Sequence, residues 1–326
     1  MTALDRRALV LYICVAVSVA FVDHRVRRER FREHVVTEYI PSVIAGTSGA
    51  PAKYRVLMPY VLDGVARRTR ADRYVLFLLS EFVFVAASLM VTHAYLRQWH
   101  SASAAAGGTF ALAALMPLTF TNTWAHPDTF PDLFLFTAGC LAVVTRRDVL
   151  LAAILFVGMF NRETMGFLAL LWARHRFPEW RQPQTSARAV VIFGVGAAVY
   201  IGLRWARGFE HYEMWMLSQN LESMKVLPAG FDPYTRIAGF FWLILVGVPG
   251  SLAFTAARQP GSPPFFRHAF EIAALFVVVA WLFAAIIETR VFLPVLPLLL
   301  PAATAAFAEP HDRVGLRWTE RQSNRR

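Results

Sequence analysis

The sequence predicts an all-α fold, a polytopic bundle of transmembrane helices. Hydrophobic residues make up 56% of the 326-residue chain and charged residues only 17%, whereas soluble domains carry about 25% charged residues. The apolar residues gather in long blocks, and a helix of roughly 17–25 residues crosses the hydrocarbon core of a bilayer. This pattern excludes a soluble enzyme, a disulfide scaffold and a disordered protein.

Seven blocks predict full membrane spans. The first, Ala8–Val22, follows Arg6 and Arg7 as in a signal peptide, but no small-residue cleavage site comes after it, so we expect an uncleaved span. The others are Tyr74–Tyr95, Ala104–Phe120, Val190–Leu203, Ile237–Ala256, Phe270–Ile287 and Val291–Phe307. No internal repeat or linker divides the chain, which predicts one membrane domain over residues 1–326.

Two shorter apolar stretches lie in the middle of the chain. Leu133–Val144 is one short run, and Val149–Ala173 fits either one long helix or two half-length helices that turn at Asn161-Arg162-Glu163. With the N-terminus in the cytoplasm, the hairpin places eleven of the later Lys and Arg residues inside and five outside, and a single crossing reverses these numbers. The positive-inside rule favours the hairpin, about ten membrane segments and two cytoplasmic termini.

The first outer loop, residues 23–73, follows the first span. Its eleven Lys and Arg residues oppose the charge rule, which long loops follow weakly. Arg25–Glu38 is basic and thinly apolar at helical spacing, which predicts an interfacial helix. The net charge of +11 is explained by arginines that flank spans, with no nucleic-acid partner, and residues 308–326 predict a basic cytoplasmic tail.

Ionisable side chains mark the predicted outer ends of four segments. They are His126, Asp128 and Asp132 after the third span, Asn161, Arg162 and Glu163 at the hairpin tip, Glu288 and Arg290 before the last span, and Glu81 in the second span. Such groups are costly near the membrane interior and suggest function. Structural ion pairs and helix caps are the alternative interpretation.

Two chemical hypotheses follow from these residue types. His126, Asp128 and Asp132 offer one imidazole and two carboxylates, which could hold a divalent cation. Arg55 ends the outer loop beside Tyr54, where its planar guanidinium could clamp a phosphate or anchor the chain at the membrane surface. The motifs of soluble nucleotide-binding enzymes and hydrolases, such as a Walker loop or G-x-S-x-G, do not occur in the sequence.

The order of these motifs resembles bacterial membrane glycosyltransferases of the GT-C type, over roughly Ala8 to Phe307. The tyrosine–arginine motif and the hairpin tip are the most specific parts of the likeness. The resemblance implies that a sugar moves from a polyprenyl-phosphate donor to an envelope acceptor at the outer face of the bacterial cytoplasmic membrane. It also implies a carboxylate base in the first outer loop, with Asp23 as first choice and Glu38 as second. That loop lacks the adjacent acidic pair of the family.

The same resemblance implies a substrate-binding set drawn from all the polar segments: Tyr54, Arg55, His126, Asp128, Asp132, Asn161, Arg162, Glu163, Glu288 and Arg290. Two other functions fit the sequence. One is a lipid or solute transporter or flippase that uses the polar cavity for binding alone. The other is a non-catalytic subunit that works with envelope-assembly proteins. The absence of an internal repeat weighs against the transporter.

Overall fold

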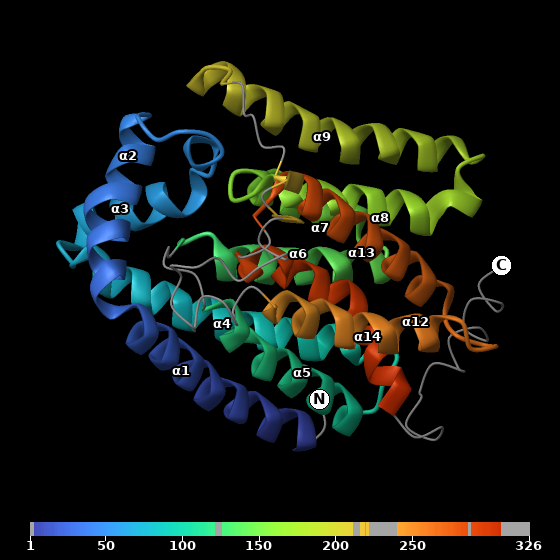
Figure 1. The fold of residues 1–326 in the computed structure, drawn as a ribbon. Coiled ribbons are helices and arrows are strands. Elements are labelled where there is room, and N and C mark those ends of the chain that lie inside the picture. Colours follow the sequence, from blue (N-terminus) through green and yellow to red (C-terminus); the bar gives the residue numbers. More distant parts are fainter. Residues whose placement is uncertain are drawn as a thin grey trace.

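The computed structural model describes residues 3–120, 126–210, 216–218, 220–221, 240–285 and 288–307, of which 3–6 and 26–33 are described by their backbone alone (Figure 1). These parts of the chain form helices and include no strand. Six of the described helices are long and apolar enough to cross a membrane: Arg7–Arg25, Arg73–Leu96, Ala102–Thr119, Pro183–Arg207, Pro264–Phe283 and Thr289–Phe307. The protein is therefore a helical membrane protein.

The first helix, α1 (Ala3–Arg32), is longer than the sequence predicts. It does not stop at Val22, and a π-helical stretch, Glu33–Tyr39, continues it. Residues 25–38 are helical, as the sequence predicts, but they continue the first helix without a break. The physical reason is that residues 23–39 are rich in arginine and glutamate, which favour helix, and include neither Gly nor Pro to end it.

The remainder of the segment between the first two predicted spans is also largely helical. It contains α2 (Ile40–Ala45), a 3-10 turn at Ala52–Tyr54 and α3 (Leu57–Thr69). Gly46 ends α2 with φ 73°, a left-handed conformation that glycine adopts without steric cost. In Figure 1, α2 and α3 lie together at one end of the bundle, beyond the last turns of α1.

The next helices cross the bundle beside α1. They are α4 (Arg73–Leu96), α5 (Ala102–Leu115), continued by a 3-10 turn at Met116–Thr119, and α6 (Thr129–Val144). The α1–α4 pair is antiparallel, because Tyr12 Oη lies 2.8 Å from His93 Nδ1 near one end and Tyr74 Oη lies 2.6 Å from His24 Nδ1 near the other. The start of α4 therefore lies at the same end of the bundle as α2 and α3.

The hairpin predicted over Val149–Ala173 is present. α7 (Asp148–Met159) and α8 (Gly166–Arg176) are half-length helices joined by a short turn. They run antiparallel, since Trp172 Nε1 at the end of α8 donates to Asp148 Oδ1 at the start of α7, at 2.9 Å. Gly158 permits the turn, because a Cβ there would lie 2.5 Å from the Met165 side chain.

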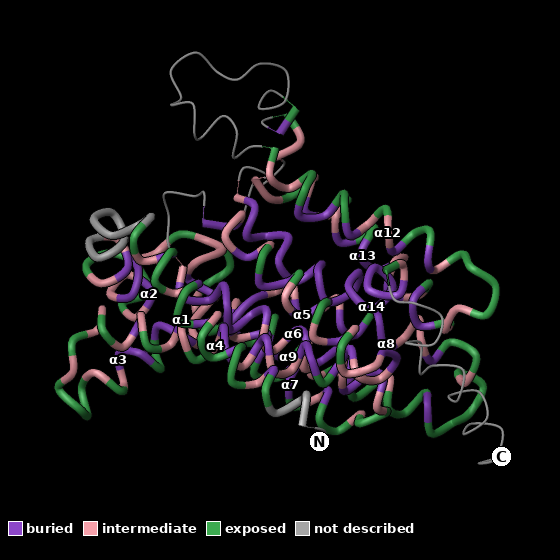
Figure 2. Tube along the Cα trace, turned by 90° about the horizontal axis from the view of Figure 1, so that it is seen from below, coloured by how far each residue is buried: buried purple, intermediate pink, exposed green. Residues whose placement is uncertain are grey.

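The last described helices differ sharply in burial. They are α9 (Pro183–Arg207), α12 (Val248–Ala257) with the π-helical turn Leu243–Gly247 before it, α13 (Pro264–Phe283) and α14 (Leu296–Phe307), which follows a 3-10 segment at Thr289–Val295. Within the apolar 18-residue stretch of each span, only 11% is buried in α9, against 89% in the last span, Thr289–Phe307. Thus α9 lies at the periphery and α14 at the centre, where buried residues concentrate (Figure 2). The predicted tail 308–326 and residues 237–239 of the predicted fifth block lie outside the described residues.

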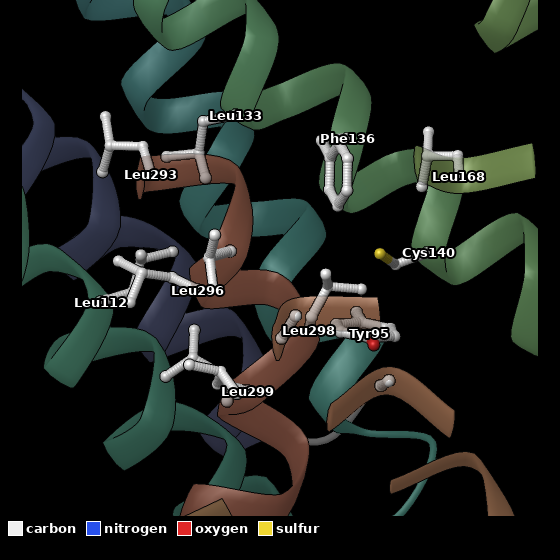
Figure 3. Close-up of a cluster of buried hydrophobic side chains, with 14 of the residues drawn as sticks. Tyr95, Leu112, Leu133, Phe136, Cys140, Leu168, Leu293, Leu296, Leu298 and Leu299 are labelled. Atoms are coloured by element: carbon white, nitrogen blue, oxygen red, sulfur yellow. The ribbon is translucent and has the colours of Figure 1, made fainter. Parts of the chain in front are cut away.

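The core around α14 is built from leucines and aromatic rings (Figure 3). Leu296, Leu298 and Leu299 of α14 are almost fully buried and face side chains of α4, α5 and α6, among them Tyr95 and Phe136. Lipid tails are as apolar as leucine, so close packing rather than exclusion from water holds such helices together. This rigid centre fixes the ends of the helices that carry the polar side chains.

Candidate functional site

Two adjoining cavities open near α2 and the hairpin tip. We call the first, of about 690 Å³, the arginine cavity; its polar lining includes Tyr54, Arg55, His126, Arg162, Glu163, Thr164, Arg204, Glu210, Glu288 and Arg290. We call the second, an open groove of about 780 Å³, the hydroxyl groove; it is lined by His34, Thr37, Glu38, Tyr39, Pro41, Ser42, Ala45, Thr47, Ser48, Gly49, Ala52, His126 and Glu288. Ala52, His126 and Glu288 line both, so the two cavities meet at these residues.

Asp128 is the centre of a buried cluster of charges. Its carboxylate lies 3.4 Å from Arg55 Nη1, 3.6 Å from Arg162 Nε and 4.0 Å from Arg290 Nη1. Its side chain is 1% exposed, and those of Arg162 and Arg290 are 3% and 2% exposed. Three arginines from distant parts of the chain thus converge on one acid.

The start of α6 places Asp128 in this cluster. The residue occupies the N-cap position, but its side chain makes no capping hydrogen bond and turns to the arginines. Asn161 Nδ2 donates to the Asp128 carbonyl at 2.9 Å, which ties the hairpin tip to this turn. The helix-cap interpretation of Asp128 is therefore wrong, because three guanidinium groups attract the carboxylate more strongly than backbone N–H groups do.

Asp132 lies one helical turn further along α6 and contacts the hairpin tip. Its carboxylate accepts from Thr164 Oγ1 at 3.2 Å and from Arg162 Nη1 at 3.5 Å. The residue is fully buried, so these bonds offset part of the cost of enclosing a charge. Asp128 and Asp132 together fix the orientation of Arg162.

The Tyr54–Arg55 motif is held between the hairpin tip and α9. The Leu57 N–H donates to the Phe160 carbonyl at 3.0 Å, which brings Arg55 Nε within 3.7 Å of Glu163. Tyr54 Oη donates to the Gly208 carbonyl at 2.9 Å. The guanidinium of Arg204, 4.3 Å from the centre of the Tyr54 ring, completes the contact by a cation–π interaction.

The segment before α14 contributes Glu288 and Arg290. Thr289 Oγ1 donates to the Leu118 carbonyl at 2.8 Å and so fixes the backbone between the two charged residues. Arg290 Nη2 donates to Glu288 Oε2 at 2.6 Å. Arg290 is nearly inaccessible, whereas the Glu288 side chain is 31% exposed and reaches the boundary of the two cavities.

Several donors of the cluster have no hydrogen-bond acceptor among the described residues. Nε and Nη1 of Arg290 and Nε of Arg162 are buried and make no hydrogen bond there. Buried guanidinium donors of this kind are costly unless an acceptor reaches them. Their positions beside the arginine cavity suit an anionic ligand with several acceptor oxygens.

The cluster also sets the charge states of its neighbours. Burial raises the pKa of Asp128, but the charges of Arg55, Arg162 and Arg290 outweigh burial and the pKa is lowered. The pKa of Glu288 is lowered in the same way, with Arg290 outweighing burial. Burial, reinforced by Arg290, lowers the pKa of His126 well below its usual value. At neutral pH both acids are ionised and His126 is neutral.

Part of the lining of the arginine cavity is apolar. It is formed by Phe167 of α8 and by Phe276, Val279, Ala280 and Phe283 of α13. α9 supplies Tyr200 and Arg204 to the other side, yet α9 packs on α7 and α8 while α13 packs on α8, α12 and α14. The cavity is therefore lined by side chains of both α9 and α13, two helices that do not pack closely on each other.

A metal ion does not fit this site. His126, Asp128 and Asp132 do not form a metal-binding group, and the part of the chain that the structure describes contains no cluster of three or more His, Cys, Asp and Glu residues that could. The Asp128 carboxylate faces three arginines, which would repel a cation. The divalent-cation hypothesis therefore lacks a suitable set of ligands here.

The structure brings together most residues that the sequence singles out. Ten of them lie in one connected cluster or its lining: Tyr54, Arg55, His126, Asp128, Asp132, Asn161, Arg162, Glu163, Glu288 and Arg290. Glu38 lines the hydroxyl groove, whereas Asp23 is fully buried in α1 and Glu81 is buried in α4, and neither lines a cavity described above. Sequence reasoning missed Arg204 and Tyr39; the only signal for Arg204 was its place at the outer end of a span.

Comparison with known proteins gives a plain result. No family model, curated protein or solved structure matches this chain. Its function is therefore inferred from the chemistry of the arginine cavity and the hydroxyl groove.

Proposed function

We propose that this chain is a membrane glycosyltransferase that moves a sugar from a lipid-phosphate-linked donor to an envelope acceptor. One observation carries the proposal. Arg55, Arg162 and Arg290 meet at Asp128 and line a cavity that is also lined by apolar side chains of α8 and α13. A lipid phosphate has the matching division, with an anionic head and a long apolar chain.

The donor would bind with its phosphate among the arginines. The N–H groups of Arg162 and Arg290 that make no hydrogen bond with described residues would donate to phosphate oxygens. The lipid chain would follow Phe276, Val279 and Phe283 along α13 and leave the protein between α9 and α13. A polyprenyl phosphate, whose chain must stay in the bilayer, fits this path.

Glu288 is the carboxylate best placed to act as the general base. It is the one charged side chain among the described residues that lines both cavities, so it can reach an acceptor in one and a donor in the other. It would take the proton of the acceptor hydroxyl as that oxygen bonds to the anomeric carbon. The bond from the anomeric carbon to the phosphate oxygen breaks, and its electron pair leaves with the phosphate.

The arginines would assist departure of the phosphate. The leaving group gains negative charge as the bond breaks, and fixed guanidinium groups stabilise that charge in a site shielded from water. The phosphate would also compete with Glu288 for Arg290, whose Nη2 lies 2.6 Å from Glu288 Oε2. Binding of the donor would thereby release the carboxylate and make it more basic.

Two other carboxylates remain candidates for the base. Glu38 lines the hydroxyl groove and lies 3.3 Å from His34 Nδ1. Asp23, the first choice from the sequence, would need a rearrangement of the buried α1–α4 contact to reach either cavity. From the positions of the three acids we rank Glu288 first, Glu38 second and Asp23 third as the general base. Variants of each acid test this ranking.

The proposal includes a topology. With α7 and α8 counted as two half-helices, about ten segments would cross or enter the bacterial cytoplasmic membrane, with both termini in the cytoplasm. The hairpin tip, α2 and α3 would face outside, as the eleven-to-five distribution of basic residues favours. The arginine cavity would then open at the outer face, where envelope acceptors are found.

A transfer assay tests the proposal. Purified protein in nanodiscs is incubated with radiolabelled polyprenyl-phosphate sugars and a membrane extract as the source of acceptor. Release of polyprenyl phosphate with label in an acceptor supports the enzyme. Glu288→Gln is expected to lower the rate by a factor of about 10²–10⁴. Glu271→Gln, which alters an acid that lines neither cavity and pairs with Arg174 at 2.6 Å, is the matched control.

A transporter would use the cavity differently. Each lining residue of the arginine cavity in α8, α9 and α13 lies in the half of its helix nearest the hairpin tip, and the leucines of α14 are buried in the apolar core. Alternating access needs a site that opens to both sides. Movement of a labelled lipid between leaflets without sugar transfer would show that the protein is a flippase and not a glycosyltransferase. If the protein shows neither activity, a non-catalytic subunit of an envelope-assembly complex is favoured.

A further inference from the structure

We propose that the hydroxyl groove binds an uncharged ligand rich in hydroxyl groups, namely the saccharide end of the acceptor. The ligand's role as acceptor rests on the proposed function. Its chemistry rests on the groove itself, whose lining differs from that of the arginine cavity in charge, in its hydrogen-bonding groups and in its side-chain shapes.

The first observation is the contrast in charge. Four arginines line the arginine cavity, but the described residues that line the hydroxyl groove include no arginine or lysine. The groove instead carries two acids, Glu38 and Glu288. Among the described lining residues, an anionic ligand would meet carboxylates with no lysine or arginine to neutralise them, so we expect the groove to select against phosphates and uronic acids.

The second observation is a set of short polar side chains. Thr37, Ser42, Thr47 and Ser48 each bring a hydroxyl group to the groove. Hydroxyl groups both donate and accept hydrogen bonds, and so do the hydroxyl groups of a sugar. Ala45, Gly49 and Ala52 between them leave open space where a ring can lie.

The third observation is that two buried hydroxyl groups make no hydrogen bond with described residues. They are Tyr39 Oη and Ser48 Oγ. Tyr39 is 4% exposed, and its ring meets the ring of His126 edge to face at 5.0 Å. Burial raises the pKa of Tyr39, so its hydroxyl keeps its proton and remains a donor. A buried hydroxyl group of this kind needs an external partner.

The groove also delivers its ligand to the right place for transfer. Two of its polar lining residues, His126 and Glu288, line the arginine cavity as well. A saccharide hydroxyl held by Tyr39 beside His126 would point towards the Glu288 carboxylate. The geometry thus joins an uncharged acceptor on one side of Glu288 to an anionic donor on the other.

Ligand binding can be measured without any transfer reaction. The full chain in nanodiscs, with no donor present, is titrated with methyl glycosides of neutral hexoses and with the corresponding methyl hexuronides. Saturation-transfer NMR reports binding of each. We expect the neutral glycosides to bind and the hexuronides to bind about fivefold more weakly or worse. Equal or tighter binding of the hexuronides would overturn the proposal.

Three variants locate the binding. Tyr39→Phe removes one hydroxyl group and is expected to weaken neutral glycosides roughly three- to tenfold. Tyr60→Phe is the matched control, because Tyr60 lines neither cavity and its hydroxyl contacts Arg207. Thr47→Arg places a cation at an exposed position of the groove and is expected to reverse the preference towards hexuronides. If neither Tyr39→Phe nor Thr47→Arg changes the affinity for the glycosides, the glycoside binds outside the groove.

The result can be separated from the fate of the proposed function. If these variants change glycoside binding but the protein transfers no sugar, the saccharide site in the groove is supported and the glycosyltransferase function is overturned. Sugar transfer whose acceptor KM is unchanged in Tyr39→Phe and Thr47→Arg would support the enzyme and overturn the groove as its acceptor site.

Discussion

Arg55 Nη1 lies 3.4 Å from Asp128 Oδ2, although 73 residues separate the two in the chain. The contact joins the segment between α1 and α4 to the start of α6, and the Asp128 carboxylate is at the same time shared with Arg162 and Arg290. One buried acid thus holds three arginines at the polar end of the cavity. The predictions below follow from that arrangement.

Asp128→Asn should strongly destabilise the fold. Removing one partner from a buried ion pair leaves uncompensated charge and costs about 3–5 kcal/mol. Glu271→Gln is the control, because Glu271 pairs with Arg174 in half-exposed surroundings where an ion pair is worth about 0–1 kcal/mol. Thermal unfolding in detergent compares the two variants. Equal, small losses of Tm would mean that the arginines do not depend on Asp128.

Arg55→Lys should keep the fold and weaken donor binding. A compact ammonium group cannot reproduce the two parallel hydrogen bonds of a guanidinium group to a phosphate. The loss of one charged hydrogen bond, about 1.5–3 kcal/mol, predicts a donor KM raised roughly 10- to 100-fold. Arg267→Lys, at an exposed residue of α13 paired with Glu271, is the control. An unchanged donor KM would reduce Arg55 to an interfacial anchor.

His126 should make stability fall in mild acid. Burial and the three arginines lower its pKa, so the folded protein resists a proton that the unfolded chain accepts below about pH 6.5. The stability tied to neutral His126 is complete above that pH and is lost as the pH falls, at up to about 1.4 kcal/mol per pH unit. Tm measured at pH 7.5 and 5.5 should drop more in the wild type than in His126→Asn. Identical drops would place His126 in a solvated site.

The two ends of the bundle should face opposite sides of the membrane. In a background without Cys14 and Cys140, a Thr69→Cys variant should react with an impermeant maleimide in intact cells. Gln184→Cys and Ser323→Cys should react only after the membrane is permeabilised. Labelling of Ser323→Cys from outside would overturn the cytoplasmic tail and the count of about ten segments.

Much of the fold follows from the sequence because apolar block length and charge are local signals. The hairpin of α7 and α8 could be predicted from short apolar runs and the distribution of basic residues, and its tip lies where Asn161 and Arg162 suggested. The end of α1 could not, because charged residues stop a membrane span without stopping a helix. Hydropathy indicates where a membrane span ends, whereas helix propensity indicates where a helix ends.

The candidate site was only partly accessible to sequence reasoning. Costly ionisable groups at span ends identified Arg162, Arg290 and Asp128. The sequence could not show that Asp128 turns away from its own helix to meet arginines, because that contact joins segments far apart in the chain. It also could not place Glu288 between two cavities, since a shared wall exists only in three dimensions.

Direct measurement of lipid-phosphate binding tests the central claim most simply. Native mass spectrometry of the purified protein, titrated with polyprenyl phosphate, should show a bound lipid in the wild type, and Arg290→Gln should weaken it roughly tenfold or more. Arg267→Gln, an exposed charge outside both cavities, should bind as the wild type does. Equal binding by all three proteins, or none by the wild type, would contradict a lipid-phosphate site at the arginine cluster.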